Sequence, residues 1–199
     1  MVNVSIDALP ELSWTAEAAE ASYADEVLTL ACGAGTDWIV DSLDGSRQDS
    51  ATALVFDAPA EFALTARATV PQPRTTYDAG VLCLWASPDY WAKLCFEFSP
   101  QGTPGVVSVV TNVFSDDCNS VEVHGDSVFL RITRAGGGWV FHSSVDGERW
   151  SFVRQFRLAI DLPVRVGFLA QSPMGGARTV QFDSIRLAPT GPSNLRDGT

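Results

Sequence analysis

The stretch YDAGVLCLWASPDYWAKLCFEF, residues 77–98, decides the fold, because two apolar runs flank a short Ser-Pro-Asp break. This pattern indicates a β-hairpin. Successive side chains of a strand point to opposite faces. One face of the second strand is therefore apolar and holds Leu94, Phe96 and Phe98. The opposite face holds Trp91, Lys93, Cys95 and Glu97. We interpret the first face as core and the second as a polar row.

The two charges of this row are too far apart to pair with each other. Lys93 and Glu97 are four residues apart, which is roughly 13 Å along an extended chain. Each needs a partner on a neighbouring strand, in water or in a ligand. Trp91 lies two residues from Lys93, so a contact between the ammonium and the indole face is expected. The sequence leaves the register open: the row is flanked either by Tyr77, Val81, Cys83 and Trp85 or by Asp78 and Gly80.

Similar alternating runs fill the rest of the chain, and Gly, Pro, Asn or Asp stands between them. The runs that predict strands cover residues 26–33, 53–59, 61–70, 106–112, 127–135, 138–145, 150–158, 163–172 and 178–187. Asp146-Gly147 and the segment Ala135–Gly138 predict tight turns. Residues 15–22 have good helix propensity, but we favour an irregular or extended segment there. Many short strands of this kind indicate an all-β sandwich or barrel.

Length and charge limit the function classes. A chain of 199 residues suits one domain, which we place at residues 1–189, and the polar residues 190–199 predict a flexible C-terminal tail. The formal net charge of −11 argues against nucleic acid and anionic membrane surfaces as partners. With no apolar run of membrane-spanning length and no basic N-terminal cluster, we expect a cytoplasmic protein. The four cysteines are then expected to be reduced and buried.

Several of these residues also form a family pattern. Tyr77-Asp78 with Gly80, then Trp91, Lys93 and Glu97, and further Ser108 to Thr111 with Ser115-Asp116, follow one another in order. This pattern resembles a family of concanavalin A-like domains that is named after a yeast regulator of enolase and is otherwise of unknown function. The resemblance covers roughly residues 12–188. It implies a jelly-roll sandwich of two antiparallel sheets, as in the lectin/glucanase superfamily, with the ligand site on the concave sheet.

On this basis the candidate ligand-binding residues are Tyr77, Asp78, Trp91, Lys93, Glu97, Ser115 and Asp116. The alternative reading of the polar row is an ion-pair network that fixes strand register. The dense oxygen atoms of residues 115–119 do not have the spacing of an EF-hand loop, so we predict no metal site. No phosphate loop or dinucleotide motif occurs, and we predict no cofactor.

The leading hypothesis is a non-catalytic domain that binds a carbohydrate or a similar polar small molecule. The second hypothesis is an enzyme, glycoside-acting or biosynthetic, with Glu97 and Asp116 as the first catalytic candidates. The Glu-x-Asp-x-x-Glu strand of related retaining glucanases is absent from the sequence. The third hypothesis is a regulatory module that binds a protein partner.

Overall fold

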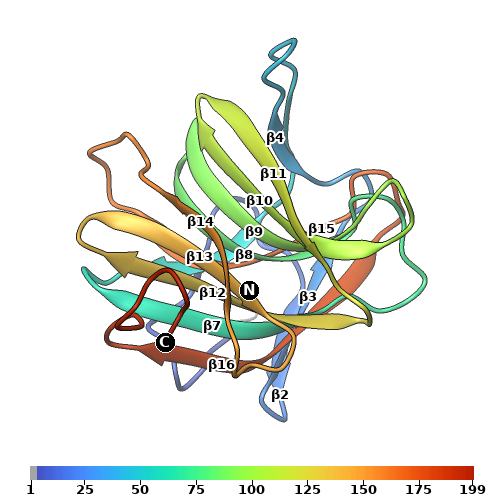
Figure 1. Cartoon of the computed structure of the whole chain (residues 1–199). Coiled ribbons are helices and arrows are strands. Elements are labelled where there is room, and N and C mark those ends of the chain that lie inside the picture. Colours follow the sequence, from blue (N-terminus) through green and yellow to red (C-terminus); the bar gives the residue numbers. More distant parts are fainter. Residues whose placement is uncertain (1–3) are drawn as a thin grey trace.

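Two antiparallel seven-stranded sheets packed face to face form the body of the molecule, as the computed structural model of residues 4–199 shows (Figure 1). Sheet A contains, in spatial order, β1 (Ser13–Trp14), β6 (Ala53–Asp57), β15 (Arg165–Gln171), β8 (Ala79–Ser87), β9 (Tyr90–Phe98), β10 (Pro104–Asn112) and β11 (Phe114–Glu122). Sheet B contains β14 (Ser151–Phe156), β13 (Gly138–Ser144), β12 (Ser127–Ala135), β7 (Phe62–Thr69), β16 (Arg178–Ala188), β3 (Val27–Cys32) and β2 (Ala21–Ala24). The predicted all-β jelly-roll sandwich is confirmed. No helix in residues 4–199 could cross a membrane.

The main core lies between the sheets and is built from alternate residues of each strand. Sheet A contributes side chains such as Leu82, Leu94 and Phe96, and sheet B contributes Leu130 and Phe141. All five are at most 1% exposed. The division of β9 into an apolar face and a polar row is therefore correct.

The register of the β8–β9 hairpin settles the alternative that the sequence left open. Cys83 lies opposite Lys93, and Trp85 lies opposite Trp91. Residues directly opposite each other in an antiparallel pair point to the same face. The odd-numbered residues of β8 therefore accompany the polar row on the outer face of sheet A.

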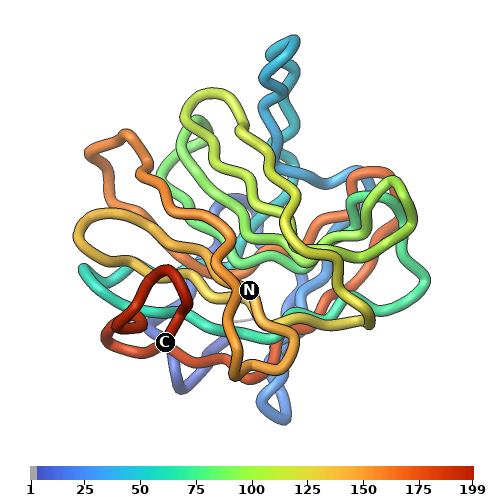
Figure 2. Tube along the Cα trace, viewed as in Figure 1, coloured from blue at the N-terminus to red at the C-terminus, as the bar shows by residue number. Residues whose placement is uncertain are grey.

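Two segments depart from the sequence-based expectations. Residues 115–119, which no predicted strand covers, belong to β11, an edge strand of sheet A. Edge strands tolerate Asp, Asn and Ser because one side of the strand meets water. Asp37 and Trp38, which also lie outside the predicted strands, begin a hairpin of β4 (Trp38–Val40) and β5 (Arg47–Asp49) that projects from the body (Figure 2).

The N-terminal segment, the C-terminal residues and the cysteines differ in how far they follow the sequence-based expectations. Residues 15–20 are irregular, as favoured. Residues 190–199, expected to be a flexible tail, fold back against β12 and β13 (Figure 2). There Arg131 donates to the Gly198 carbonyl oxygen at 2.8 Å. All four cysteines are free, but only Cys83 and Cys95 are fully buried, and Cys118 is exposed on β11.

Candidate functional site

The β4–β5 hairpin covers part of the outer face of sheet A and gives this face a small core of its own. The Trp38 ring lies 4.7 Å from the Trp85 ring and 5.8 Å from the Trp91 ring, measured between centroids. The Trp38 indole N–H donates to the Ala51 carbonyl oxygen at 2.7 Å. At the other end of the strand, the Ser115 hydroxyl accepts the Val40 N–H at 2.9 Å. The hairpin is thus fixed to sheet A at both ends of β4.

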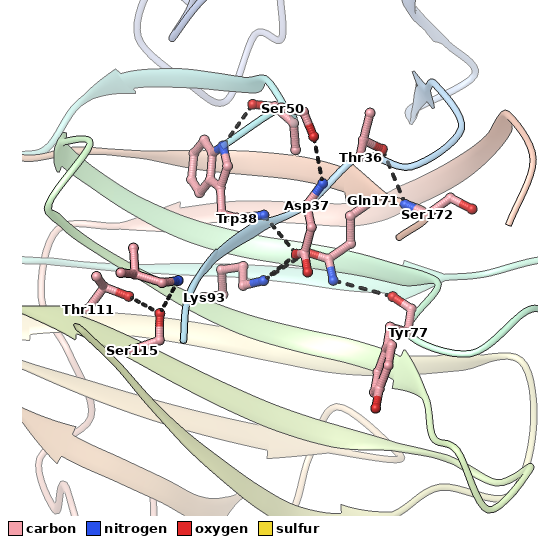
Figure 3. Close-up of polar contacts among 12 residues, drawn as sticks. Thr36, Asp37, Trp38, Ser50, Tyr77, Lys93, Thr111, Ser115, Gln171 and Ser172 are labelled. Atoms are coloured by element: carbon pink, nitrogen blue, oxygen red, sulfur yellow. Dashed lines mark hydrogen bonds and ion pairs between the residues drawn. The ribbon is translucent and has the colours of Figure 1, made fainter. Parts of the chain in front are cut away.

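Lys93 lies at the edge of this small core and is buried. Its ammonium donates to Asp37 Oδ1 at 2.8 Å and to Gln171 Oε1 at 3.0 Å (Figure 3). The Gln171 amide in turn donates to the Tyr77 carbonyl oxygen at 3.3 Å. The ammonium also lies 5.6 Å from the centroid of the Trp91 ring, so the expected cation–π contact is present. Burial, the largest single influence, lowers the pKa of Lys93. The charge and hydrogen bond of Asp37, together with the contributions of Cys95 and Glu97, outweigh burial, and the net shift of the pKa is upward.

An open cavity of about 580 Å³ extends from Lys93 between the hairpin and the far end of β9. Its floor is formed by Val107 and Val109 of β10. The polar groups of its walls are Asp37, Asp41, Gln48, Glu97, Asp117, Asn119 and Gln171. Tyr77, Gln101 and Met174 also line it. We call this space the acidic cavity, since Lys93 is the one basic residue among the described residues that line it.

Strand register explains why these side chains converge. Val109 lies opposite Lys93 on one side and opposite Asp117 on the other. Lys93, Val109 and Asp117 therefore form a row across three strands and point to the same face. Val107 lies opposite Asn119 in the next row of that face.

Two carboxyl groups of the acidic cavity have no ion pair or hydrogen bond with any other residue in the range 4–199: Glu97 and Asp117. Burial raises the pKa of Glu97 to about 7, although the Lys93 ammonium opposes the shift. Burial likewise raises the pKa of Asp117, again against Lys93. Because this pKa is close to neutral, Glu97 is partly protonated and partly ionised near pH 7. In their ionised forms both groups are free to accept hydrogen bonds from a ligand.

The structure brings three of the seven predicted ligand-binding residues to the acidic cavity: Tyr77, Lys93 and Glu97. Trp91 is 2% exposed under Trp38 and does not line it. Asp78 is fully buried and forms an ion pair with Arg178, accompanied by a hydrogen bond from Ser172. Trp91 and Asp78 therefore stabilise the packing of the strands and do not form part of the cavity wall.

The remaining two predicted residues lie on β11 but outside the acidic cavity. Ser115 is hydrogen-bonded to Thr111 and anchors the hairpin. Asp116 forms an ion pair of 2.7 Å with Arg154 of β14, which joins the edges of the two sheets. Asp116 does not share the cavity with Glu97, so the two do not face a common ligand there.

The sequence reasoning missed the contributions of Asp117, Asn119 and Gln171. Asp117 and Asn119 belong to a segment rich in Asp and Asn, which are poor strand formers, so the sequence pattern did not predict the strand β11. Gln171 offered a usable signal, because it is a polar residue at the end of a buried apolar run and is 1% exposed. Among the described residues there is no group of three or more His, Cys, Asp or Glu residues that could hold a metal ion.

Comparisons of structure place the chain among known sandwiches. An uncharacterised protein from Saccharomyces cerevisiae superposes with a TM-score of 0.79 at 25% identity, covering 90% of this chain and 97% of the yeast chain. A xylan β-1,4-xylosidase from Bacillus halodurans gives 0.60 at 13% identity, covering 92% of this chain but only 40% of the enzyme. An alginate lyase from Klebsiella pneumoniae gives 0.55 at 10% identity, covering 85% and 84%. The last two likenesses concern the fold alone.

Comparison of the sequence gives a more specific result than these structural likenesses. No curated protein matches the chain. The profile of a family described as "Protein of unknown function (DUF1349)" matches residues 14–190, and this description names no regulator of enolase. Since the match covers most of the chain, the protein belongs to the DUF1349 family.

Proposed function

We propose that the acidic cavity binds a carbohydrate or a similar polyhydroxylated small molecule. The observation that supports this most is the pair of unpartnered carboxyl groups, Glu97 and Asp117, in an open cavity of about 580 Å³. Small-molecule sites typically have volumes of about 300–1,000 Å³. Ionised carboxylates accept strong hydrogen bonds, and sugar hydroxyls are suitable donors.

The other walls suit a sugar as well. Amide groups of Gln48 and Asn119 donate and accept hydrogen bonds, while Val107 and Val109 offer an apolar floor for the C–H face of a ring. The Tyr77 ring is 40% exposed at the rim, where an aromatic ring can stack on a sugar.

The charge of the cavity walls limits the class of ligand that can bind. Asp37, Asp41, Glu97 and Asp117 line the acidic cavity, and the single lysine is already paired with Asp37. An anionic ligand would meet uncompensated carboxylates, which is unfavourable. We therefore expect neutral or amine-bearing sugars to bind in the acidic cavity and sugar phosphates to be rejected from it.

The test is a binding screen by thermal shift, followed by calorimetry on any hit. Neutral sugars, amino sugars and sugar phosphates are compared with wild-type protein, Glu97→Gln, Asp117→Asn and the control Glu61→Gln. Glu61 is exposed and lies outside the acidic cavity. Losing a charge-assisted hydrogen bond is expected to weaken binding about tenfold or more. Equal affinity in all four proteins would remove the site assignment.

A second candidate function is acid–base catalysis on a polar substrate. One observation favours it: the pKa of Glu97 is raised to about 7, which is near the value that serves a general acid or base at neutral pH. The partner carboxyl would be Asp117 rather than Asp116, because Asp117 lines the same cavity. Turnover of a bound glycoside that Glu97→Gln abolishes without weakening binding would support catalysis. Binding without turnover would favour the first proposal.

The third hypothesis is a regulatory module for a protein partner such as a metabolic enzyme. It is favoured if no sugar in the screen raises the melting temperature. Its support is the resemblance of the sequence pattern to a family named after an enolase regulator. A stable complex with enolase in size-exclusion chromatography would favour it, and separate elution would count against it.

A further inference from the structure

A second hollow, of about 330 Å³, lies on the outer face of sheet B, on the opposite side of the sandwich from the acidic cavity. The charged residues that line it are Arg131 and Arg186, and Thr65, Ser184 and Thr190 contribute hydroxyl groups. No Asp or Glu of residues 4–199 lines this hollow, although the chain has a net charge of −11. We call it the arginine pocket.

The two arginines are aligned by strand pairing. Thr65 of β7 lies opposite Arg131 of β12 on one side and opposite Arg186 of β16 on the other. With neighbouring strands about 4.8 Å apart, the two arginine Cα atoms are roughly 10 Å from each other. Two long guanidinium side chains can therefore converge above the Thr65 hydroxyl.

An irregularity in β16 produces this alignment. The register between β16 and β7 shifts between Asp183 and Arg186, and Ser184 there has a φ of 51°. Such β-bulges re-aim side chains and are frequent next to functional sites. Without the one extra residue on β16, Ile185 rather than Arg186 would lie in register with Thr65.

Arg131 is buried but has no counter-ion. It is 9% exposed and forms no ion pair with the described residues. Its guanidinium lies over the Trp150 ring at 4.0 Å, and one N–H donates to the Gly198 carbonyl oxygen, while Nε has no partner. Burial lowers the pKa of Arg131 to about 10.

Three other arginines with mostly buried side chains do have a counter-ion. Arg74, Arg154 and Arg178, whose side chains are also mostly buried, each form an ion pair with an aspartate. A buried charge without a partner is costly, so an anion that reached Arg131 would be strongly favoured. Arg186, which is exposed and has no ion pair or hydrogen bond in residues 4–199, supplies a second charge at the mouth.

We propose that the arginine pocket binds the oxyanion group of a small polar molecule, with the two guanidinium groups and the Thr65 hydroxyl as donors. Guanidinium groups bind carboxylate, phosphate and sulfate through paired N–H donors. The adjoining rings of Phe129 and Trp150 provide apolar surface for the body of the molecule. The pocket is independent of the acidic cavity and selects the opposite charge.

Calorimetric titration with four probes tests the proposal: glucuronate, glucose 6-phosphate, glucose 6-sulfate and, as the neutral reference, glucose. The proteins are wild type, Arg186→Gln, the control Arg157→Gln, and Glu97→Gln. Arg157 is an exposed arginine outside the pocket with no ion pair in the described chain. The three anions separate a carboxylate site from a phosphate or sulfate site.

The expected result is saturable binding of at least one anion, weakened about tenfold or more by Arg186→Gln and unchanged in Arg157→Gln and Glu97→Gln. Arg131→Lys keeps the charge but loses the paired donors, so it is expected to weaken the same anion. If Arg131→Lys does not fold, the anion affinity of Arg186→Gln, a substitution at an exposed residue, decides the test. Absence of saturable anion binding would overturn the proposal. Equal weakening in Arg157→Gln would show a general charge effect and would also overturn it.

Discussion

The Glu97→Gln substitution is expected to stabilise the protein at neutral and alkaline pH. Burial raises the pKa of Glu97 in the folded protein to about 7, against 4.5 for the exposed side chain. Between these two values the unfolded chain releases the proton while the folded protein keeps it. The free energy of unfolding of the wild-type protein therefore falls as pH rises from 4.5 to 7, and levels off above 7.

The size of this loss follows from the difference of about 2.5 pH units. At 1.36 kcal/mol per unit the upper limit is about 3.4 kcal/mol. Because the acidic cavity is open and Glu97 is only partly buried, water screens the charge, and about 2 kcal/mol is a realistic value. Glutamine does not ionise, so the variant avoids this loss.

The assay is urea unfolding of the wild-type protein and Glu97→Gln at several pH values between 4.5 and 8.5. The difference between the two unfolding free energies is expected to grow by about 2 kcal/mol in favour of the variant across this range. The raised pKa of Asp117 changes the unfolding free energy of both proteins with pH in the same direction, so its contribution largely cancels in the difference. Glu61→Gln, at an exposed site, is expected to show no such trend. A constant difference, or a variant that weakens as pH rises, would refute the reasoning, since it would mean that Lys93 outweighs burial.

Two further substitutions test the framework by urea unfolding. Trp91→Ala is expected to cost about 3–5 kcal/mol, because the ring is buried under Trp38, and a variant of unchanged stability would contradict that packing. Gly167→Ala is expected to cost several kcal/mol or to prevent folding, because a Cβ atom there would approach the Leu54 carbonyl oxygen of β6 within van der Waals radii. Its control, Gly176→Ala, has open space and is expected to change stability by less than about 0.5 kcal/mol; equal losses in both would argue against the close approach.

Local patterns were sufficient to predict most of the fold. The alternation in residues 77–98 placed Leu94 in the core and Lys93 on the other face, because side-chain period follows directly from strand geometry. The strand β11 escaped prediction because its Asp and Asn residues are poor strand formers, and only its position at the sheet edge accommodates them.

The candidate site was predictable only in part, because its arrangement depends on contacts between distant segments. Nothing near Trp91 in the sequence indicates that Trp38, 53 residues earlier, covers it. The partner of Lys93, Asp37, comes from the same distant hairpin. For the same reason the pattern made Trp91 a candidate ligand-binding residue, whereas the structure has a buried indole beside an open acidic cavity.

The buried packing of Trp91 against Lys93 has an optical consequence. An indole has a larger dipole in its excited state than in its ground state, so its emission wavelength follows the local electric field. The ammonium of Lys93 lies 5.6 Å from the ring centroid and contributes to that field, and the acidic cavity begins at the same ammonium. Trp91 and its neighbour Trp38 thus act as an intrinsic fluorescent probe. Filling the cavity or ionising Glu97 is expected to shift the emission of these two indoles, without any added label.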